Sequence, residues 1–176
     1  MQALAFWKAV TMDQADFLEG LISVLEHGRV RYCVIGGQAV NAYAEPLVSL
    51  DLDLAVATED LEAAEAALRR QFRVERFPHS LNVSQTGSRL RVQIQTDPRY
   101  AAFVGRASVR EVLGLRLPVA SVEDVLEGKI WAALDPERRP SKRRKDLLDI
   151  ERLIEEHSHL RERLPAEIRE LLAAGA

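Results

Sequence analysis

Two aspartates that alternate with leucines are the residues of this sequence whose types and spacing best suit chemistry. Asp51 and Asp53 lie in the run DLDLAV, and side chains two apart on a strand share a face. A strand over residues 50–56 would bury its leucines and hold the two aspartate Cα atoms roughly 7 Å apart. Adjacent carboxylates repel unless a cation lies between them, and Mg²⁺ prefers a couple of carboxylates together with phosphate oxygens. The pair is therefore a candidate metal site, and two solvated acids at an exposed strand end are the alternative.

A double glycine precedes this strand and suits phosphate binding. Gly36 and Gly37 follow the apolar run of residues 32–35 and open a predicted helix that must end before Pro46. Glycine lets a backbone approach phosphate oxygens closely, and the first turn of a helix offers free N–H groups. The alternative is an ordinary tight turn between a strand and a helix.

Together the two features resemble the signature of the nucleotidyltransferase superfamily, a Gly-Gly or Gly-Ser turn followed by a strand with Asp-x-Asp. The closer resemblance is to small bacterial AbiEii-type nucleotidyltransferases, members of which act as toxins in toxin–antitoxin pairs. Those proteins often carry the strand Arg-x-Thr-x-Asp-x-Asp. Ser49 matches its hydroxyl position, whereas Leu47 stands in place of its arginine. The resemblance implies that the aspartate pair holds Mg²⁺ or Mn²⁺ and that the double glycine and Ser49 bind an NTP.

A lysine and an aspartate fall inside the apolar stripes of two predicted helices in the last third of the chain. Projected at 100° per residue, Lys129 lies in one stripe and Asp146 in the next, with Asp149 at its edge. An unpaired buried charge costs roughly 3–5 kcal/mol, so the two side chains either pair as a structural salt bridge or reach an active site. Residues 126–150 are similar to the AbiEii-type pattern of a lysine helix, a basic loop and a Lys-Asp-x-x-Asp helix. This resemblance implies functional roles for Lys129 and Asp146.

Six positive charges fall within residues 138–145, in the loop between the two predicted helices and at the start of the second, in a chain whose net charge is −3. Cations at the start of a helix oppose its macrodipole, so local helix stability does not explain them. A triphosphate or an RNA backbone nearby would explain these cations, and a solvated basic loop is the alternative. The run consists of Arg138, Arg139, Lys142, Arg143, Arg144 and Lys145, of which Lys142, Arg143 and Lys145 are the candidate substrate-binding residues.

One residue departs from the superfamily pattern. Superfamily enzymes usually place a third carboxylate on a neighbouring strand, where it binds the catalytic metal. The candidate strand here, residues 89–95, presents Gln93 at the expected position. A neutral amide can hold a water or make a weak metal contact, but it cannot serve as a general base.

Composition and patterning predict one α/β domain with a helical C-terminal third. The resemblance implies that its core, to residue 120, is a nucleotidyltransferase-like mixed sheet, with C-terminal helices packed on it from residue 121. The 176 residues are 47% hydrophobic and hold one cysteine, Cys33, which favours a reducing, cytoplasmic location. No signal peptide is expected, and no stretch approaches the roughly 18 apolar residues of a membrane span. The expected helices cover residues 14–28, 36–45, 58–71, 121–134, from 141 or 142 to 156, and from 165, with Gly28, Thr58 and Ser121 as caps. The expected strands cover residues 32–35, 50–56, 72–77, 80–86, 89–95 and 115–120, with a hairpin at residues 87–88.

These observations favour a Mg²⁺-dependent nucleotidyltransferase that transfers a nucleotide from an NTP to a hydroxyl of an RNA, a protein or a small molecule. The alternative is an NTP-binding or partner-binding regulatory module with impaired catalysis, which Gln93 suggests. A purely structural domain with solvated acids is a third interpretation. An antitoxin protein is an expected partner under the toxin–antitoxin resemblance, and no membrane is expected.

Overall fold

The computed structural model describes the backbone of residues 2–175 and the side chains of residues 14–175. The chain divides into two compact units, which we describe in turn. Unit 1 comprises the residues up to Cys33 together with Ser49–Gly105, and unit 2 comprises Val34–Val48 together with the residues from Arg106 onward. Both combine helices with parallel and antiparallel strand pairs, so the predicted α/β class with a mixed sheet is confirmed. The expected single domain with a core to residue 120 stays a prediction.

Four strands of unit 1 follow the order β3-β4-β5-β2. Strand β2 runs parallel to β5, whereas β5 and β4, and β4 and β3, are antiparallel. The elements are α1 (Gln2–His27), β2 (Asp51–Val56), a 3₁₀ turn (Thr58–Asp60), α3 (Leu61–Arg69), β3 (Arg73–Phe77), β4 (Ser80–Ser84), β5 (Arg91–Gln95), a second 3₁₀ turn (Pro98–Tyr100) and α4 (Ala101–Val104).

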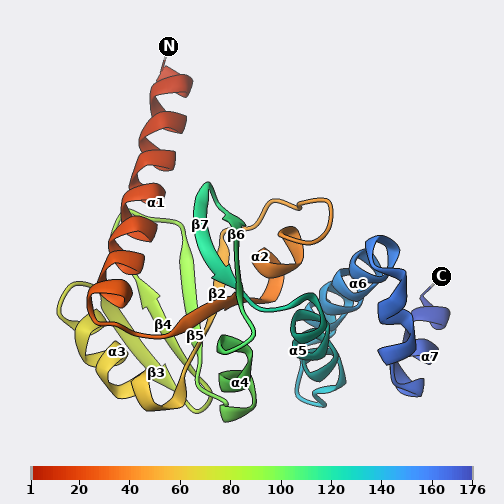
Figure 1. Cartoon of the computed structure of the whole chain (residues 1–176). Helices are drawn as coiled ribbons and strands as arrows, with labels where there is room; N and C mark the ends of the chain where they lie inside the picture. The colour runs from red at the N-terminus through yellow and green to blue at the C-terminus, as the bar shows by residue number, and fades with distance from the viewer. Residues whose placement is uncertain (1, 176) are drawn as a thin grey trace. The chain divides into compact units, whose positions relative to one another are not determined.

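Helix α3 covers one face of these strands. Val74 of β3 is buried, and Arg76, which shares its face, pairs with Glu65 of α3. Helix α1 packs against α3 (Figure 1), and Phe17 meets Phe72 edge to face with ring centroids 5.2 Å apart. The core on this side is completed by side chains that are at most 2% exposed, namely Leu52, Leu54, Leu81, Val83, Val92 and Ile94. The opposite face carries the polar side chains that alternate with them.

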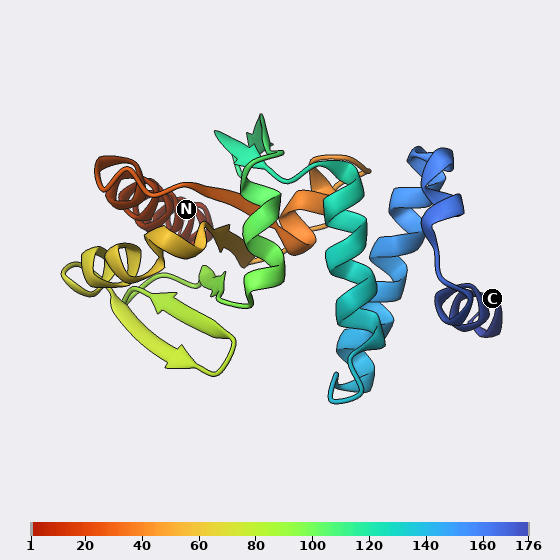
Figure 2. The same ribbon diagram turned by 60° about the horizontal axis from the view of Figure 1, so that its bottom comes forward.

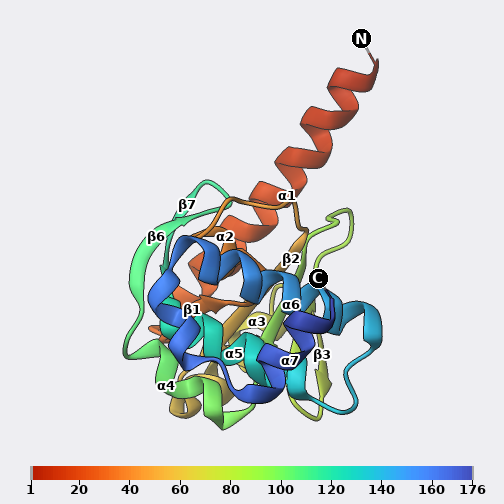
Figure 3. The same cartoon turned by 90° about the vertical axis from the view of Figure 1, so that its right-hand side faces the viewer.

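Unit 2 contains a strand order β1-β7-β6 and a group of helices. Strand β1 (Tyr32–Ile35), which begins in unit 1, pairs in parallel with β7 (Leu115–Val119), and β7 pairs antiparallel with β6 (Ser108–Val112). The short helix α2 (Gly36–Asn41) packs against α5 (Val122–Leu134) and α6 (Pro140–Glu156). Figure 2 shows α5 and α6 side by side, joined by a short loop. A 3₁₀ turn (Ser158–Arg163) and α7 (Ala166–Ala174) follow, and α7 packs on both longer helices (Figure 3).

Most expected elements are present, and the differences have local causes. Strand β6 was not expected because four of its five residues are exposed, so it lacks an apolar alternation. Helix α6 begins at Pro140 rather than at residue 141 or 142, because the fixed φ of proline fits the first turn. Leu50 was expected in the core but is 38% exposed, since β2 starts one residue later.

One of the three expected helix caps was wrong. Thr58 does not cap a helix but is the first residue of a 3₁₀ turn, and Ala57 occupies the N-cap position of that turn. Helix α1 ends at His27, so Gly28 follows it at the expected C-cap position, and the left-handed conformation that favours glycine falls one residue later on Arg29, whose φ is 52°. The Ser121 cap is confirmed, because its Oγ accepts a hydrogen bond from the Asp124 amide at 3.2 Å. Among the described residues, no helix has the length and apolar character needed to cross a membrane.

Candidate functional site

The aspartate pair lies on the face of unit 1 opposite α3, as the alternation predicts. The leucines between the aspartates are fully buried, whereas Asp51 and Asp53 are half-buried. Oδ1 of Asp51 lies 2.7 Å from Nε of Arg91, and the Asp51 amide donates a hydrogen bond to Oγ of Ser49 at 3.2 Å. An ion pair with so exposed an arginine contributes about 0–1 kcal/mol, so Arg91 is no strong barrier to a cation at Asp51.

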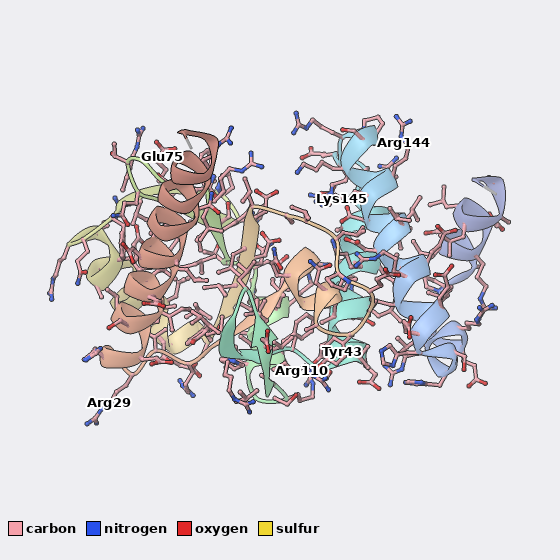
Figure 4. The ribbon with its side chains drawn as sticks, turned by 90° about the horizontal axis from the view of Figure 1, so that it is seen from above. Arg29, Tyr43, Glu75, Arg110, Arg144 and Lys145 are labelled. Atoms are coloured by element: carbon pink, nitrogen blue, oxygen red, sulfur yellow. The ribbon has the colours of Figure 1, made fainter. Side chains whose placement is uncertain are left out.

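Strand register places an amide beside the aspartate pair. Asp53 of β2 lies opposite Gln93 of β5, Gln93 lies opposite Asn82 of β4, and Asn82 lies opposite Glu75 of β3. These four side chains form a row with a carboxylate at each end, and Figure 4 labels Glu75 at the outer strand. Neighbouring strands are about 4.8 Å apart, so Glu75 lies roughly 14 Å from Asp53, too far to share a metal ion with it. The neighbour of Asp53 on β5 is therefore Gln93, at the position where the superfamily pattern expects a carboxylate.

The double glycine makes the turn from β1 into α2 in unit 2. Gly36 has a φ of 67°, the left-handed conformation that side chains disfavour. A Cβ atom added to Gly37 would meet no heavy atom within 4 Å. Gly36 is therefore needed for the turn itself, whereas Gly37 leaves open space beside its backbone.

Lys129 and Asp146 meet, and they belong to a longer chain of charges in unit 2. Five side chains alternate in sign along it, with N–O distances of 2.8, 3.1, 2.7 and 2.8 Å. The sequence is Arg138, Asp146, Lys129, Asp149 and Arg152. Three cations and two anions leave this ion-pair chain with one positive charge.

The centre of the ion-pair chain is buried. Lys129 is 8% exposed, Asp146 2% and Asp149 1%. Burial alone would lower the pKa of Lys129, but the charges of Asp149 and Asp146 outweigh it and hold the pKa above its ordinary value of 10.5. The ammonium is thus charged at neutral pH and directed at two carboxylates. This is the salt bridge between two helices that the sequence offered as one alternative.

Sequence reasoning missed the far end of the ion-pair chain. Arg152 lies three residues after Asp149 on α6, a spacing that could have indicated the pair. Its guanidinium also reaches Asn41 at the end of α2, with Nη2 2.9 Å from Oδ1, and the carbonyl oxygen of Glu45. No sequence pattern connects residues that lie 111 positions apart.

The basic run does not act as one surface. Arg138 is part of the ion-pair chain, and Arg143 donates through Nη2 to the carbonyl oxygen of Asp135 at 2.8 Å. Arg143 also lines a groove of about 490 Å³ beside α7. Lys142 is half-buried, whereas Arg144 and Lys145 are exposed and extend from the beginning of α6 (Figure 4).

Among the described residues, no group of three or more His, Cys, Asp and Glu side chains is arranged to hold a metal ion. A pair of carboxylates completed by substrate oxygens is nevertheless a set that Mg²⁺ prefers. Asp51 and Asp53, half-buried on one strand face, fit that description.

The fold is that of solved nucleotidyltransferases. The chain is similar to the antibiotic-resistance factor ANT(2'')-Ia, at 16% identity and a TM-score of 0.58, over 93% of this chain and 91% of that one. It is also similar to the lincosamide antibiotic adenylyltransferase LnuA, at 15% identity and a TM-score of 0.53, over 82% and 97% of the two chains. A nucleotidyltransferase-like protein of Thermotoga maritima (TM1012) matches at 16% identity and a TM-score of 0.51, over 68% and 84%. At such identities the likeness shows the fold alone.

Family membership follows from the sequence. Residues 36–175 match the family described as "Nucleotidyl transferase AbiEii toxin, Type IV TA system". The chain therefore belongs to the AbiEii nucleotidyltransferase family, as the double glycine and the aspartate strand predict. No curated protein matches the chain.

Proposed function

We propose that the protein is a nucleotidyltransferase that uses Mg²⁺ or Mn²⁺ to transfer a nucleotide from an NTP to a hydroxyl acceptor. Membership of the AbiEii family supports the reaction class. The observation that carries the proposal is the aspartate pair, two carboxylates side by side on the strand face that α3 leaves uncovered. In the reaction, the acceptor oxygen forms a bond to the α-phosphorus, the bond to the bridging oxygen breaks, and pyrophosphate leaves while the hydroxyl proton is released.

The residues of the chain would divide the work as follows. Asp51 and Asp53 would hold the metal ion, which supplies positive charge to the phosphate oxygens when bound. Phosphate oxygens would approach the backbone at Gly36 and Gly37 closely, because neither residue has a Cβ atom and the space beside Gly37 is open. Further proposed contacts to the NTP come from Ser49, Lys142, Arg143 and Lys145, and further functional residues are Lys129 and Asp146.

The family supports a proposal for the partner, and exposed cations of α6 support a proposal for the acceptor. Its description places its members in type IV toxin–antitoxin systems. We therefore propose an antitoxin protein as the natural partner. An RNA hydroxyl is the acceptor that the exposed Arg144 and Lys145 favour, because cations attract a phosphate backbone.

A second candidate function is supported by one observation, the amide of Gln93 beside Asp53. A site with two carboxylates and no general base on the neighbouring strand can bind a metal-bound NTP without transferring it. The protein would then be a regulatory module that binds an NTP or a partner.

A labelling experiment separates the two functions. Purified wild type, Asp53→Asn and Glu75→Gln are incubated with each α-labelled NTP, Mg²⁺ and either total RNA or cell extract. Binding of each NTP is measured in parallel. Glu75→Gln is the matched control, because it removes a carboxylate from the same row at its far end. Loss of one metal-holding carboxylate should lower the transfer rate by about 10²-fold or more, since metal stabilisation amounts to several kcal/mol.

Transfer by wild type and Glu75→Gln, but not by Asp53→Asn, is the expected result. Absence of transfer together with NTP binding that requires Asp53 supports the regulatory module. Equally weak NTP binding by wild type and Asp53→Asn contradicts both functions.

A further inference from the structure

Arg152 connects the ion-pair chain of unit 2 to the segment that follows α2. One arm of its guanidinium pairs with Asp149, with Nη1 2.8 Å from Oδ1. The other nitrogen, Nη2, donates to Oδ1 of Asn41 at 2.9 Å and to the carbonyl oxygen of Glu45. A single side chain of α6 thus contacts its own helix, the last residue of α2 and the loop beyond it.

Asn41 continues the connection into that loop. Its Nδ2 donates to the carbonyl oxygen of Leu47 at 2.7 Å, and its Oδ1 accepts from the Leu47 amide at 2.9 Å. The side chain of Asn41 therefore pairs with both backbone groups of Leu47 while Arg152 holds the same Oδ1. We call this set of contacts between Arg152, Asn41, Glu45 and Leu47 the loop clamp.

Tyr43, near the start of this loop, is held by other contacts, since its hydroxyl donates to the carbonyl oxygen of Ala120 at 2.7 Å and its ring lies against His157. The loop clamp acts on the residues that follow, which packing does not bury. Residues 45–48 are all exposed, and Leu47 and Val48 are 48% and 102% exposed. The side chain of Arg152, in contrast, is only 12% exposed. A buried guanidinium needs acceptors, and its planar fork can satisfy a carboxylate, an amide oxygen and a carbonyl together, which a lysine ammonium cannot match in the same geometry.

We propose that Arg152 and Asn41 are positioning residues for nucleotide transfer, which hold residues 45–48 in one conformation and couple that conformation to Lys129 through Asp149. This inference rests on the proposed function, because the clamped loop leads directly into Ser49 and Asp51. Asp149 lies between Lys129 and Arg152, at 2.7 and 2.8 Å. A change at Arg152 therefore acts on both ends of the connection without Arg152 touching the substrate.

The test uses Arg152→Lys and Asn41→Ala in the full chain, with Arg106→Lys as the matched control. Arg106 also forms a two-point pair with an aspartate of unit 2, Asp124, which is not one of the residues of the loop clamp. Hydrogen exchange of the Leu47 amide reports on the clamp, and kcat and KM for the NTP report on transfer. Arg152→Lys should speed hydrogen exchange of the Leu47 amide by about tenfold. That amide donates to Oδ1 of Asn41, and the substitution removes the hydrogen bond by which Arg152 holds this oxygen, a loss of about one hydrogen bond.

The kinetic pattern should separate positioning from simple loss of stability. A misplaced active-site residue slows the chemical step more than it weakens substrate binding. Arg152→Lys should therefore lower kcat by about 10–100-fold, with KM within about threefold of wild type. Asn41→Ala should reproduce both effects while leaving every charge in place, and Arg106→Lys should produce neither. Wild-type exchange at Leu47 and wild-type kcat in Arg152→Lys would overturn the inference.

The proposed function can fail separately. If the wild-type protein transfers no nucleotide, the proposed transfer is wrong and the kinetic role of Arg152 is wrong with it. Exchange at Leu47 still reports whether Arg152 holds the loop, since it requires no activity.

Discussion

At the residue scale, the side chain opposite Asp53 on β5 determines whether the proposed metal site has two carboxylates or three. The parallel register of β2 and β5 sets Gln93 opposite Asp53. An amide there adds neither charge nor a base. In the proposed site, two carboxylates would therefore hold the metal ion together with the phosphate oxygens of the substrate.

Replacing that amide by an acid should strengthen metal binding. Gln93→Asp adds a third carboxylate one strand spacing from Asp53, so Mn²⁺ should bind about tenfold more tightly, a gain of roughly 1.4 kcal/mol. Without metal the same variant should have a lower Tm, because three like charges then repel. Calorimetric titration with Mn²⁺ and thermal unfolding with and without it measure both effects.

Asn82→Asp is the control for this change. It places the same charge on the same face one strand further away, opposite Gln93. Equal Mn²⁺ affinities for the two variants would show that Gln93 does not occupy the position of a third metal-binding residue.

The ion pairs of Lys129 should make the free energy of unfolding depend on pH in the alkaline range. Its pKa in the folded protein is raised above 10.5 by Asp149 and Asp146 against the effect of burial. A group whose pKa is raised by folding contributes its full stabilisation below the pKa that it has in the unfolded chain. That stabilisation is lost as the pH rises through the pKa of the folded state. Lys129→Met should therefore destabilise by about 3 kcal/mol near neutral pH, and the deficit should shrink above about pH 10.5.

Denaturant unfolding of wild type and variant at several pH values measures that difference. Arg106→Met is a suitable comparison, because it removes an ion pair with Asp124 whose arginine keeps its proton throughout. The loss in free energy of unfolding caused by Arg106→Met should stay constant with pH. A Lys129→Met deficit that did not shrink would mean that the ammonium does not supply the stability.

At the element scale, helices and strands are positioned by their ends as much as by their apolar faces. Helix α6 begins on a proline, α5 on the Ser121 cap, and α2 on a glycine in the left-handed conformation. The end of α1 is unusual, because Arg29 rather than Gly28 carries a positive φ (Figure 4 labels Arg29). A non-glycine residue in that conformation costs roughly 1–2 kcal/mol.

Arg29→Gly should therefore stabilise the protein. We expect a gain of about 1 kcal/mol in the free energy of unfolding, since glycine adopts this conformation without the steric cost. Denaturant unfolding measures the change. Arg70→Gly is the comparison, because Arg70 follows α3 with a φ of −73°, where glycine has no advantage. A loss of stability in Arg29→Gly would contradict this account of the helix end.

The elements could be predicted from the sequence where the signal was local. Apolar alternation gave the strands that carry Asp51 and Gln93, and the helical projection placed Lys129 and Asp146 on buried faces. Strand β6 was missed because its side chains are mostly exposed. The loop clamp could not be predicted at all, because Arg152 and Asn41 are related by the folding of two distant helices and by no spacing in the chain.

At the scale of the whole molecule, the family match and the structural units divide the chain differently. The family match begins at Gly36, so α1 and β1 lie outside it. The two units are interleaved instead, since Val34–Val48 belongs with the helices from Arg106 onward. The resemblance stated from the motifs was therefore specific for the family, but it gave no information on how the chain is partitioned.

The proposal of an antitoxin partner implies that this protein is the toxin of the pair, and this toxin proposal makes a prediction for the whole protein in cells. Producing wild type in bacteria should slow growth, whereas Asp53→Asn at the same level should not, because transfer requires the metal-holding carboxylate. Glu75→Gln should slow growth as wild type does. Growth curves with immunoblots for protein level measure this. Growth slowed equally by Asp53→Asn would show that toxicity does not require transfer, and unimpaired growth with wild type would contradict the toxin proposal.

The positions of Asn41 and Arg152 in the chain determine when the loop clamp can form during synthesis. Chains are made from the N-terminus, so the aspartate strand is complete early, when Asn41 still lacks its partner. Arg152 is made 111 residues after Asn41, and only then can residues 45–48 be clamped. A ribosome-bound fragment that stops before α6 thus carries both aspartates but lacks the contacts that fix the loop leading to them. If the clamp is required for transfer, the host that makes this protein is exposed to its activity only after α6 has been made.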